Sequence, residues 1–86
     1  GAAAGGGGAA AAASDERMKE NIEKVGVSPS GINIYKFNYI GKPQHEFIGV
    51  LAQEISADYP DAVVMGEDGY LSVNYDLIDV QFEQVK

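Results

Sequence analysis

The chain has 86 residues, with 13 acidic and 6 basic side chains and a net charge of −7. This excess of acids argues against a nucleic-acid or anionic-membrane partner, because both attract clustered Lys and Arg. The absence of cysteine excludes disulfides and thiolate metal sites. The single histidine, His45, lacks ligands at metal-binding spacing, and we expect no metal ion and no other cofactor.

Residues 1–13 contain only glycine and alanine. Two interpretations stay open: a flexible or partly helical linker, or a stretch of unassigned residues written as Gly and Ala. We expect this segment to contribute nothing to a core. It is shorter than the roughly 20 residues that span a bilayer, and it lacks the basic start of a signal peptide. The sequence therefore predicts one small domain over residues 14–86, of a size at which association of several copies commonly adds stability.

Residues 14–25 have the pattern of an amphipathic helix. Ser14 suits the cap position, and the two acids that follow it suit the positive end of a helix dipole. Met18, Ile22 and Val25 recur at intervals of four and three residues, which predicts one apolar stripe.

The rest of the chain alternates between strand and helix patterns. Residues 32–41 are rich in β-branched and aromatic side chains, which predicts a strand. Residues 47–59 predict a short helix preceded by a strand, and residues 62–75 predict a hairpin. Residues 76–85 predict a last short helix. The predicted fold class is therefore α+β, in the order helix, strand, helix, hairpin, helix.

Five segments, in this order along the chain, resemble one known family: SDERMKENIE, GINIYKFNY, FIGVLAQEI, YPDAVV and DGYLSVNYD. They are similar to the intramolecular chaperone domain of phage tailspikes and fibres, the endosialidase-type auto-processing domain that also occurs in a membrane-bound transcription factor of animals. The resemblance covers residues 14 to about 80. It implies a domain at the C-terminus of a long phage protein, which promotes trimer assembly of the preceding part and is then released by self-cleavage.

The resemblance also implies partners and a location. The partners are two further copies of the chain, in a homotrimer around a three-fold axis, and the upstream part of its own polypeptide. The location is the phage virion, and the cytoplasm of the host bacterium during assembly. No nucleic acid and no membrane is expected as a partner.

A serine–lysine dyad is the catalytic group that the resemblance implies, with the serine opening the SDERMKEN segment and the lysine five residues later. These positions are Ser14 and Lys19. A lysine acts as a base only when neutral, so its pKa must fall from roughly 10.4 toward 7–8. Burial lowers it, because burial disfavours the charged form. We expect docking of a partner subunit to complete the burial of Lys19, which would leave the monomer inactive.

The spacing of the dyad restricts its geometry. Positions five apart on a regular helix point about 140° from each other. We therefore expect either that Ser14 lies at the non-helical cap and turns back toward Lys19, or that the dyad forms across subunits.

The bond between Ala13 and Ser14 is the expected site of cleavage. Attack of the Ser14 hydroxyl on the preceding carbonyl passes through a five-membered ring, whereas attack on its own carbonyl needs a strained four-membered ring. The bond between Ser14 and Asp15 is therefore the second choice, cut by the hydroxyl of another subunit. Asn21 is a candidate oxyanion donor, and His45 is a candidate supporting residue near the cut.

Two other functions stay open. In the first, Ser14 only caps a helix and Lys19 is a solvated surface residue, so the chain is a non-cleaved structural trimerisation domain of a phage fibre or internal virion protein. In the second, aromatic side chains bind sugars at a fibre tip, although packing in the core and at subunit interfaces is the favoured role for them. The favoured function is a chaperone with single-turnover serine peptidase activity on its own polypeptide.

Overall fold

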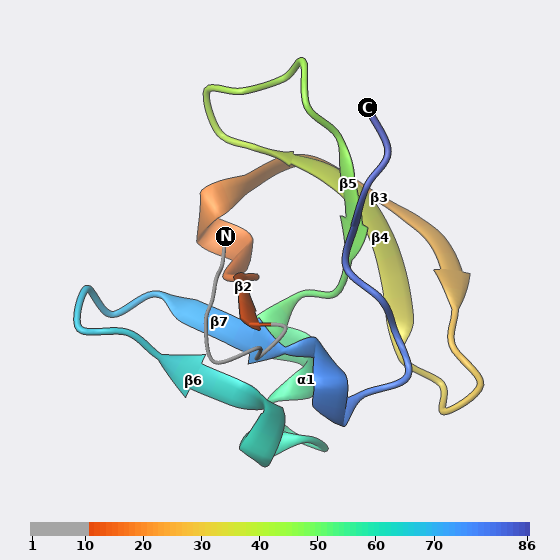
Figure 1. Cartoon of the computed structure of the whole chain (residues 1–86), viewed down its shortest axis with the longest axis vertical. Helices are drawn as coiled ribbons and strands as arrows, with labels where there is room; N and C mark the ends of the chain where they lie inside the picture. Colours follow the sequence, from red (N-terminus) through yellow and green to blue (C-terminus); the bar gives the residue numbers. More distant parts are fainter. Residues whose placement is uncertain (1–10) are drawn as a thin grey trace.

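The structure is a computed structural model that describes residues 11–86, and it contains two antiparallel sheets and one short helix (Figure 1). One sheet has three strands in the order β2-β7-β6, and the other has four in the order β3-β4-β5-β8. The bounds are β2 (Ala11–Ala13), β3 (Lys19–Val27), β4 (Asn33–Tyr39), β5 (Phe47–Gly49), α1 (Ala52–Ile55), β6 (Val63–Met65), β7 (Leu71–Asn74) and β8 (Glu83–Gln84).

The predicted α+β class is wrong, because the described chain is mostly β-structure. The helix predicted over residues 14–25 is a single 3-10 turn, η2 (Glu16–Met18), followed by the nine-residue strand β3. Asn21 has a φ of 56°, in the left-handed region that a right-handed helix excludes, and it falls in an irregularity of the β3–β4 pairing. The expected apolar stripe is not buried, since Ile22 and Val25 are exposed.

Later elements agree better with expectation. The predicted strand over residues 32–41 is confirmed as the somewhat shorter β4, and the predicted hairpin is confirmed as β6 and β7, with Met65 opposite Leu71. The helix predicted over residues 47–59 is reduced to α1, although the strand expected before it is present as β5. In the described chain the last predicted helix is replaced by a 3-10 turn, η4 (Tyr75–Leu77), and by β8, which pairs with β5.

Part of the glycine–alanine run belongs to the fold. β2 pairs with β7, with Ala12 opposite Val73, and Ala12 packs against the core. This differs from the expectation that residues 1–13 contribute nothing to a core. The physical reason is that β7 would otherwise be an edge strand with unpaired backbone groups, which β2 hydrogen-bonds. The linker interpretation of residues 1–10 lies outside the described residues.

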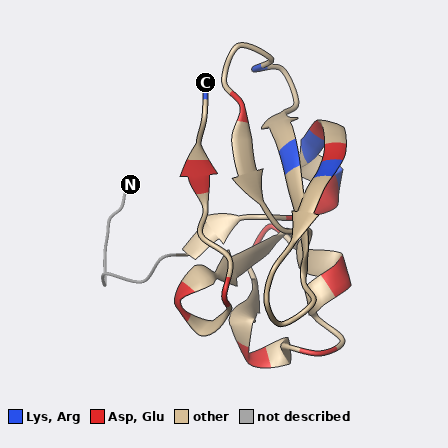
Figure 2. Ribbon diagram, turned by 90° about the vertical axis from the view of Figure 1, so that its right-hand side faces the viewer, with Lys and Arg blue, Asp and Glu red and all other residues tan. Residues whose placement is uncertain are grey.

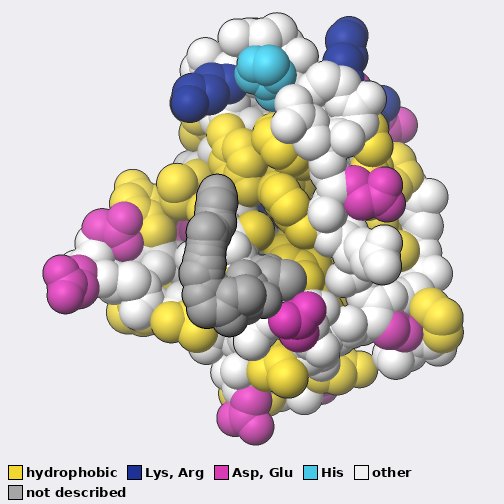
Figure 3. All heavy atoms as spheres, viewed as in Figure 1, with side chains coloured by type: hydrophobic (Ala, Val, Ile, Leu, Met, Phe, Trp, Pro, Cys, Tyr) yellow, Lys and Arg dark blue, Asp and Glu magenta, His cyan; other side chains and the backbone are white. Residues whose placement is uncertain are grey.

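A single hydrophobic core joins the two sheets. Its buried side chains come from segments throughout the fold: Ile32, Val50, Ala52, Ile55, Ala62, Val73, Tyr75 and Val80. Hydrophobic side chains also gather near the centre of the face in Figure 3, while acidic side chains lie mainly toward its periphery.

Charge is divided between the two halves of the molecule. The six basic residues lie in or near η2, β3 and β4, or at the end of the sequence, and none falls between residues 43 and 85. The segments that form α1 and the β6–β7 hairpin therefore carry acids alone, which Figure 2 shows as red without blue in the lower part of the ribbon.

Candidate active site

The two residues of the predicted dyad lie where the chain passes from one sheet to the other. Ser14 follows β2 of the three-stranded sheet, and Lys19 is the first residue of β3 in the four-stranded sheet. Both are buried: Ser14 is 0% exposed and Lys19 is 5% exposed. A single chain thus buries the serine and the lysine at one junction.

Ser14 is held by hydrogen bonds at its side chain and its backbone. Its Oγ bonds the hydroxyl of Tyr75 at 2.8 Å. Its N–H donates to the Leu71 carbonyl at 3.1 Å, and its carbonyl accepts from the N–H of Ala52 at 2.8 Å. The cap of η2 is Asp15, not Ser14, so the polar side chain of Ser14 is buried for a reason other than helix capping.

Lys19 has its amine in an apolar setting. Its Nζ donates to the Val50 carbonyl at 2.5 Å and lies 3.8 Å from the centroid of the Phe37 ring. Burial lowers the pKa of Lys19 to about 7, against the opposing effect of the Asp15 carboxylate. Near neutral pH a large fraction of the amine is therefore unprotonated, as a general base requires. Because one chain suffices for this burial, the expectation that a partner subunit must complete it is wrong.

Ser14 and Lys19 converge on Val50. The Tyr75 hydroxyl, which bonds Ser14, accepts a hydrogen bond from the Val50 N–H at 3.0 Å, while Lys19 bonds the Val50 carbonyl. Within residues 11–86, no hydrogen bond joins Ser14 to Lys19 directly. Gly49 allows this close packing, since a Cβ there would lie 2.6 Å from the Tyr75 hydroxyl oxygen.

The carbonyl of the expected scissile bond has its own hydrogen-bond donor. The hydroxyl of Tyr39 donates to the carbonyl oxygen of Ala13 at 2.6 Å. Tyr39 lies directly opposite Lys19 in the β3–β4 ladder, and residues opposite each other in an antiparallel pair extend their side chains to the same face. Burial raises the pKa of Tyr39, so this hydroxyl keeps its proton at physiological pH.

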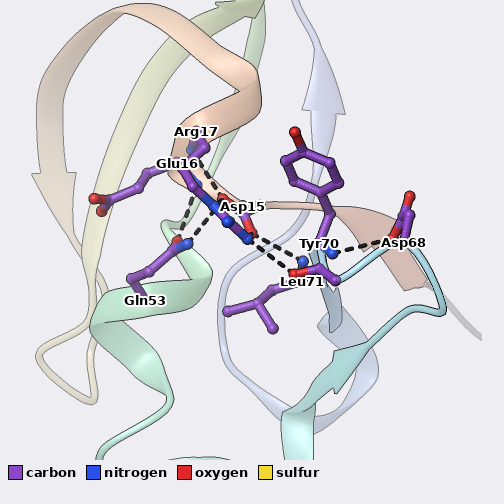
Figure 4. Close-up of polar contacts among 8 residues, drawn as sticks. Asp15, Glu16, Arg17, Gln53, Asp68, Tyr70 and Leu71 are labelled. Carbon is purple, nitrogen blue, oxygen red and sulfur yellow. Dashed lines mark hydrogen bonds and ion pairs between the residues drawn. The ribbon is translucent and has the colours of Figure 1, made fainter.

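Asp15 anchors the segment that follows the expected scissile bond (Figure 4). Its carboxylate accepts hydrogen bonds from the backbone N–H and the guanidinium of Arg17, from the Gln53 side chain and from the Leu71 N–H. Hydrogen bonding from Arg17 holds the pKa of Asp15 well below its usual range, although burial acts in the opposite direction. The carboxylate therefore fixes this turn against both α1 and β7.

Asn21 and His45, the two residues predicted to support cleavage, lie apart from the dyad. Asn21 is exposed and donates its side-chain amide to Asn38 at 2.7 Å. His45 is also exposed, and its ring Nδ1 bonds the Gln84 side chain at 3.2 Å. Over the described residues, neither forms a hydrogen bond with the serine or the lysine of the dyad.

Sequence reasoning missed the contributions of Tyr39, Tyr75 and the Val50 backbone. Tyr39 and Tyr75 belong to the aromatic side chains for which the sequence predicts packing in the core or at interfaces, and both do pack against other aromatic rings. The sequence contained a signal for Tyr39. If residues 19–27 are read as a strand, they form a hairpin with residues 33–39 around the glycine-containing segment between them, and this pairing brings Tyr39 close to Lys19.

The approach to Ala13 is open to solvent. A surface cavity of about 560 Å³ is lined by Ala13, Met18, Tyr39 and Tyr70, among others. Ala13, on the carbonyl side of the expected scissile bond, therefore borders a cavity that water can enter.

Two further properties of the described part of the chain bear on its chemistry. Residues 11–86 contain no group of three or more His, Cys, Asp or Glu side chains placed to hold a metal ion. None of their helices has the length and apolar character needed to cross a membrane.

Comparison with known proteins gives one match. The family model described as "Chaperone of endosialidase" matches residues 14–64. No curated protein and no solved structure matches the chain. The matched segment contains Ser14, Lys19 and Tyr39, whereas Tyr75 lies beyond it.

Proposed function

Because the chain belongs to the chaperone of endosialidase family, we propose that residues 14–86 form an intramolecular chaperone domain of a phage structural protein. In this proposal the domain promotes homotrimer assembly of the polypeptide that precedes it. It is then released when Ser14 and Lys19 cleave the bond between Ala13 and Ser14. The domain acts once on its own chain, in the host cytoplasm during assembly, and the phage protein that it assembles is located in the virion.

The observation that carries the proposal is the burial of both Ser14 and Lys19 at the junction of the two sheets. A lysine that is 5% exposed, with a pKa of about 7, is costly to keep unless its neutral amine has a use. The Lys19 amine donates to the Val50 carbonyl. The Val50 N–H donates to the Tyr75 hydroxyl, which in turn bonds Ser14. The geometry thus favours a nucleophile and a base held at one point.

The first chemical step is an acyl shift from nitrogen to oxygen. The neutral Lys19 amine takes the proton of the Ser14 hydroxyl, and Oγ forms a bond to the Ala13 carbonyl carbon. The bond from that carbon to the Ser14 nitrogen then breaks, and the Lys19 ammonium returns the proton to this nitrogen. The products are an ester of Ala13 on Ser14 Oγ and a free Ser14 amine.

The second step consumes water. A water molecule attacks the ester carbonyl and the bond to Oγ breaks. One proton of the water restores the Ser14 hydroxyl, and the other is taken up by the free Ser14 amine, which leaves a carboxylate on Ala13 and an ammonium on Ser14. Cleavage therefore creates an anion and a cation where a neutral, partly buried peptide bond stood. Charges are costly where they are shielded from water, and in the described part of the chain three residues of β2 pair with β7, so separation of the two parts is favoured.

The proton transfer requires a rearrangement of two hydrogen bonds. Ser14 must turn from Tyr75, and Lys19 must leave the Val50 carbonyl. Catalytic hydrogen bonds are often long or misaligned before the reactive complex forms. We propose that trimer assembly provides this rearrangement, since β3 is an edge strand with exposed apolar side chains, Ile22 and Val25 among them, which suit contact with further copies.

The test is a time course of the purified 86-residue chain on denaturing gels, beside Ser14→Ala and Lys19→Met. We expect cleavage of the parent chain and none in either variant. The matched controls are Ser56→Ala, which changes an exposed serine after α1, and Lys24→Met, which changes an exposed lysine of β3. Cleavage that persists in Ser14→Ala would refute the proposed dyad.

A non-cleaved trimerisation domain is the second candidate. The observation that favours it is the hydrogen bonding of Ser14 to Tyr75 and of Lys19 to Val50, which satisfies both groups without a reaction. Sedimentation together with the gel separates the two candidates. A stable trimer of full-length chains after prolonged incubation at pH 8 supports the second.

A further inference from the structure

We propose that Tyr39 is a catalytic residue, whose hydroxyl stabilises the oxyanion that forms on the Ala13 carbonyl oxygen during cleavage. This inference rests on the proposed self-cleavage at Ala13–Ser14, and it names the donor that such a reaction needs. Acyl transfer passes through a tetrahedral intermediate, and one fixed donor at the developing negative charge is commonly a large part of the catalysis.

The geometry of the contact fits this role. The Tyr39 hydroxyl already donates to the Ala13 carbonyl oxygen at 2.6 Å, which lies in the range of strong O–H···O hydrogen bonds. As Oγ of Ser14 adds to the carbon, the oxygen becomes an anion while staying attached to the same carbon. Hydrogen bonds to charged acceptors are about twice as strong as neutral ones, so the bond strengthens along the reaction coordinate.

The position of the hydroxyl is fixed by the packing of its ring. The Tyr39 ring meets the Phe37 ring edge-on, with centroids 5.4 Å apart, and the Phe47 ring at 5.2 Å. Lys19 lies opposite Tyr39 in the ladder, so the ammonium formed by proton transfer arises close to the oxyanion. A donor held in place before the reaction avoids the cost of reorganisation during it.

The protonation state of Tyr39 suits a donor rather than a base. Burial raises its pKa above the ordinary value of a tyrosine, so the hydroxyl remains protonated wherever the Lys19 amine is neutral enough to accept a proton. The Tyr39 proton is shared with the oxyanion and is not transferred. When the carbon–nitrogen bond breaks, the same hydroxyl remains bonded to the ester carbonyl.

The first experiment compares cleavage rates of the 86-residue chain, of Tyr39→Phe and of Tyr35→Phe. Tyr39→Phe keeps the ring packing and removes the donor, and we expect a loss of about 10²–10³-fold in rate. Tyr35→Phe is the matched control: it removes a hydroxyl from the same strand, one that bonds the exposed Glu54, and we expect an unchanged rate. A wild-type rate in Tyr39→Phe, with Ser14→Ala inactive, overturns the role of Tyr39 and leaves the proposed function standing.

The second experiment reads the contact without cleavage. The chain is prepared by chemical synthesis with Ser14→Ala and a ¹³C label on the Ala13 carbonyl, with and without Tyr39→Phe. We expect the labelled amide I band to move to higher frequency when the hydroxyl is removed, because a carbonyl that loses a donor stiffens. An unmoved band means that Tyr39 does not polarise this carbonyl, and it refutes the inference whatever the gel shows.

The two failures are therefore distinguishable. If the parent chain stays intact, or if Ser14→Ala is still cut, the proposed function fails and the catalytic role of Tyr39 fails with it, whatever the band shows. If only Tyr39→Phe cuts normally, the dyad survives and another donor serves the oxyanion. As a guard against misfolding, 3-fluorotyrosine at position 39 keeps the hydroxyl and makes it a stronger donor. We expect that chain to cut faster than the parent, and a slower rate would contradict the donor role.

Discussion

The amine of Lys19 lies 3.8 Å from the centre of the Phe37 ring. A charged amine in this position is attracted by the face of the ring, and the Asp15 carboxylate adds a further attraction. Burial nevertheless dominates, because it lowers the pKa of Lys19 to about 7. The apolar pocket, rather than a partner charge, therefore sets the protonation state of this lysine.

The rate of cleavage should rise with pH through about 7 and then level off, because Lys19 accepts the Ser14 proton only when neutral. First-order rates from gels between pH 5.5 and 9 check this expectation. Lys19→Arg should be inactive at every pH, because a guanidinium does not lose its proton in this range, while Lys24→Arg should follow the parent profile. A rate independent of pH would contradict a lysine base.

The carboxylate of Asp15 should control the midpoint of that profile. Its negative charge raises the pKa of Lys19, so Asp15→Asn should move the midpoint to a pH below that of the parent chain. The variant should also be less stable by about 1–3 kcal/mol, because an amide cannot accept all the hydrogen bonds from Arg17, Gln53 and Leu71. A midpoint displaced to higher pH would show that Asp15 does not act on the lysine by charge.

Folding stability should increase with pH between about 7 and 10. The unfolded lysine titrates near 10.5 and the folded one near 7, so the unfolded state binds more protons in this window and its free energy rises relative to the folded state. Urea unfolding of the uncut Ser14→Ala chain should show a gain on the order of 3 kcal/mol across the window.

The same titration in a Ser14→Ala, Lys19→Met chain should lack this gain. Above pH 10 the stability of both chains should fall with pH. Burial raises the pKa values of Tyr39 and Tyr75 in the folded state, so these tyrosines ionise there only in the unfolded state. An equal rise with pH in both chains would mean that Lys19 is not the titrating group.

Gly49 should be intolerant of a side chain. A Cβ at this position would lie 2.6 Å from the Tyr75 hydroxyl oxygen and 3.2 Å from Phe82, so Gly49→Ala should cost about 1–3 kcal/mol by overpacking and should displace Tyr75 from Ser14. Gly26→Ala in β3 is the control, because a Cβ there has no atom within 4 Å, and we expect a change within about 0.5 kcal/mol. Thermal melts of both variants make the comparison, and equal melting temperatures would contradict the tight packing at Tyr75.

How much of the fold follows from the sequence can be judged at its two ends. The spacing of Met18, Ile22 and Val25 fits a helix, but Met18 ends the 3-10 turn η2, and Ile22 and Val25 are exposed side chains of the strand β3. At the other end, Ile78, Val80 and Phe82 alternate with a period of two, which is the pattern of extended chain, and Val80 is buried. A short segment can fit both the helical period and the strand period of two residues. Pairing with distant strands then determines whether it forms a helix or a strand.

The dyad could be named from sequence because Ser14 and Lys19 lie in a motif that resembles a known family. The surroundings could not, because Tyr39, Val50 and Tyr75 come from three separate segments that only the tertiary fold brings together. The burial of Lys19 likewise depends on Phe37 and on the strand pairing opposite it. The local sequence pattern thus indicates which groups can react. Long-range packing determines the pKa of Lys19 and the position of the hydrogen-bond donors around the site.

The most direct test of the central claim is the intact mass of the 86-residue chain after incubation at pH 8, measured beside Ser14→Ala. We predict that the parent chain yields a fragment that begins with Ser14 and a second fragment that ends with Ala13, while Ser14→Ala keeps its full mass. A parent chain of unchanged mass, or a fragment that begins with Asp15, would contradict cleavage by Ser14 at its own preceding carbonyl.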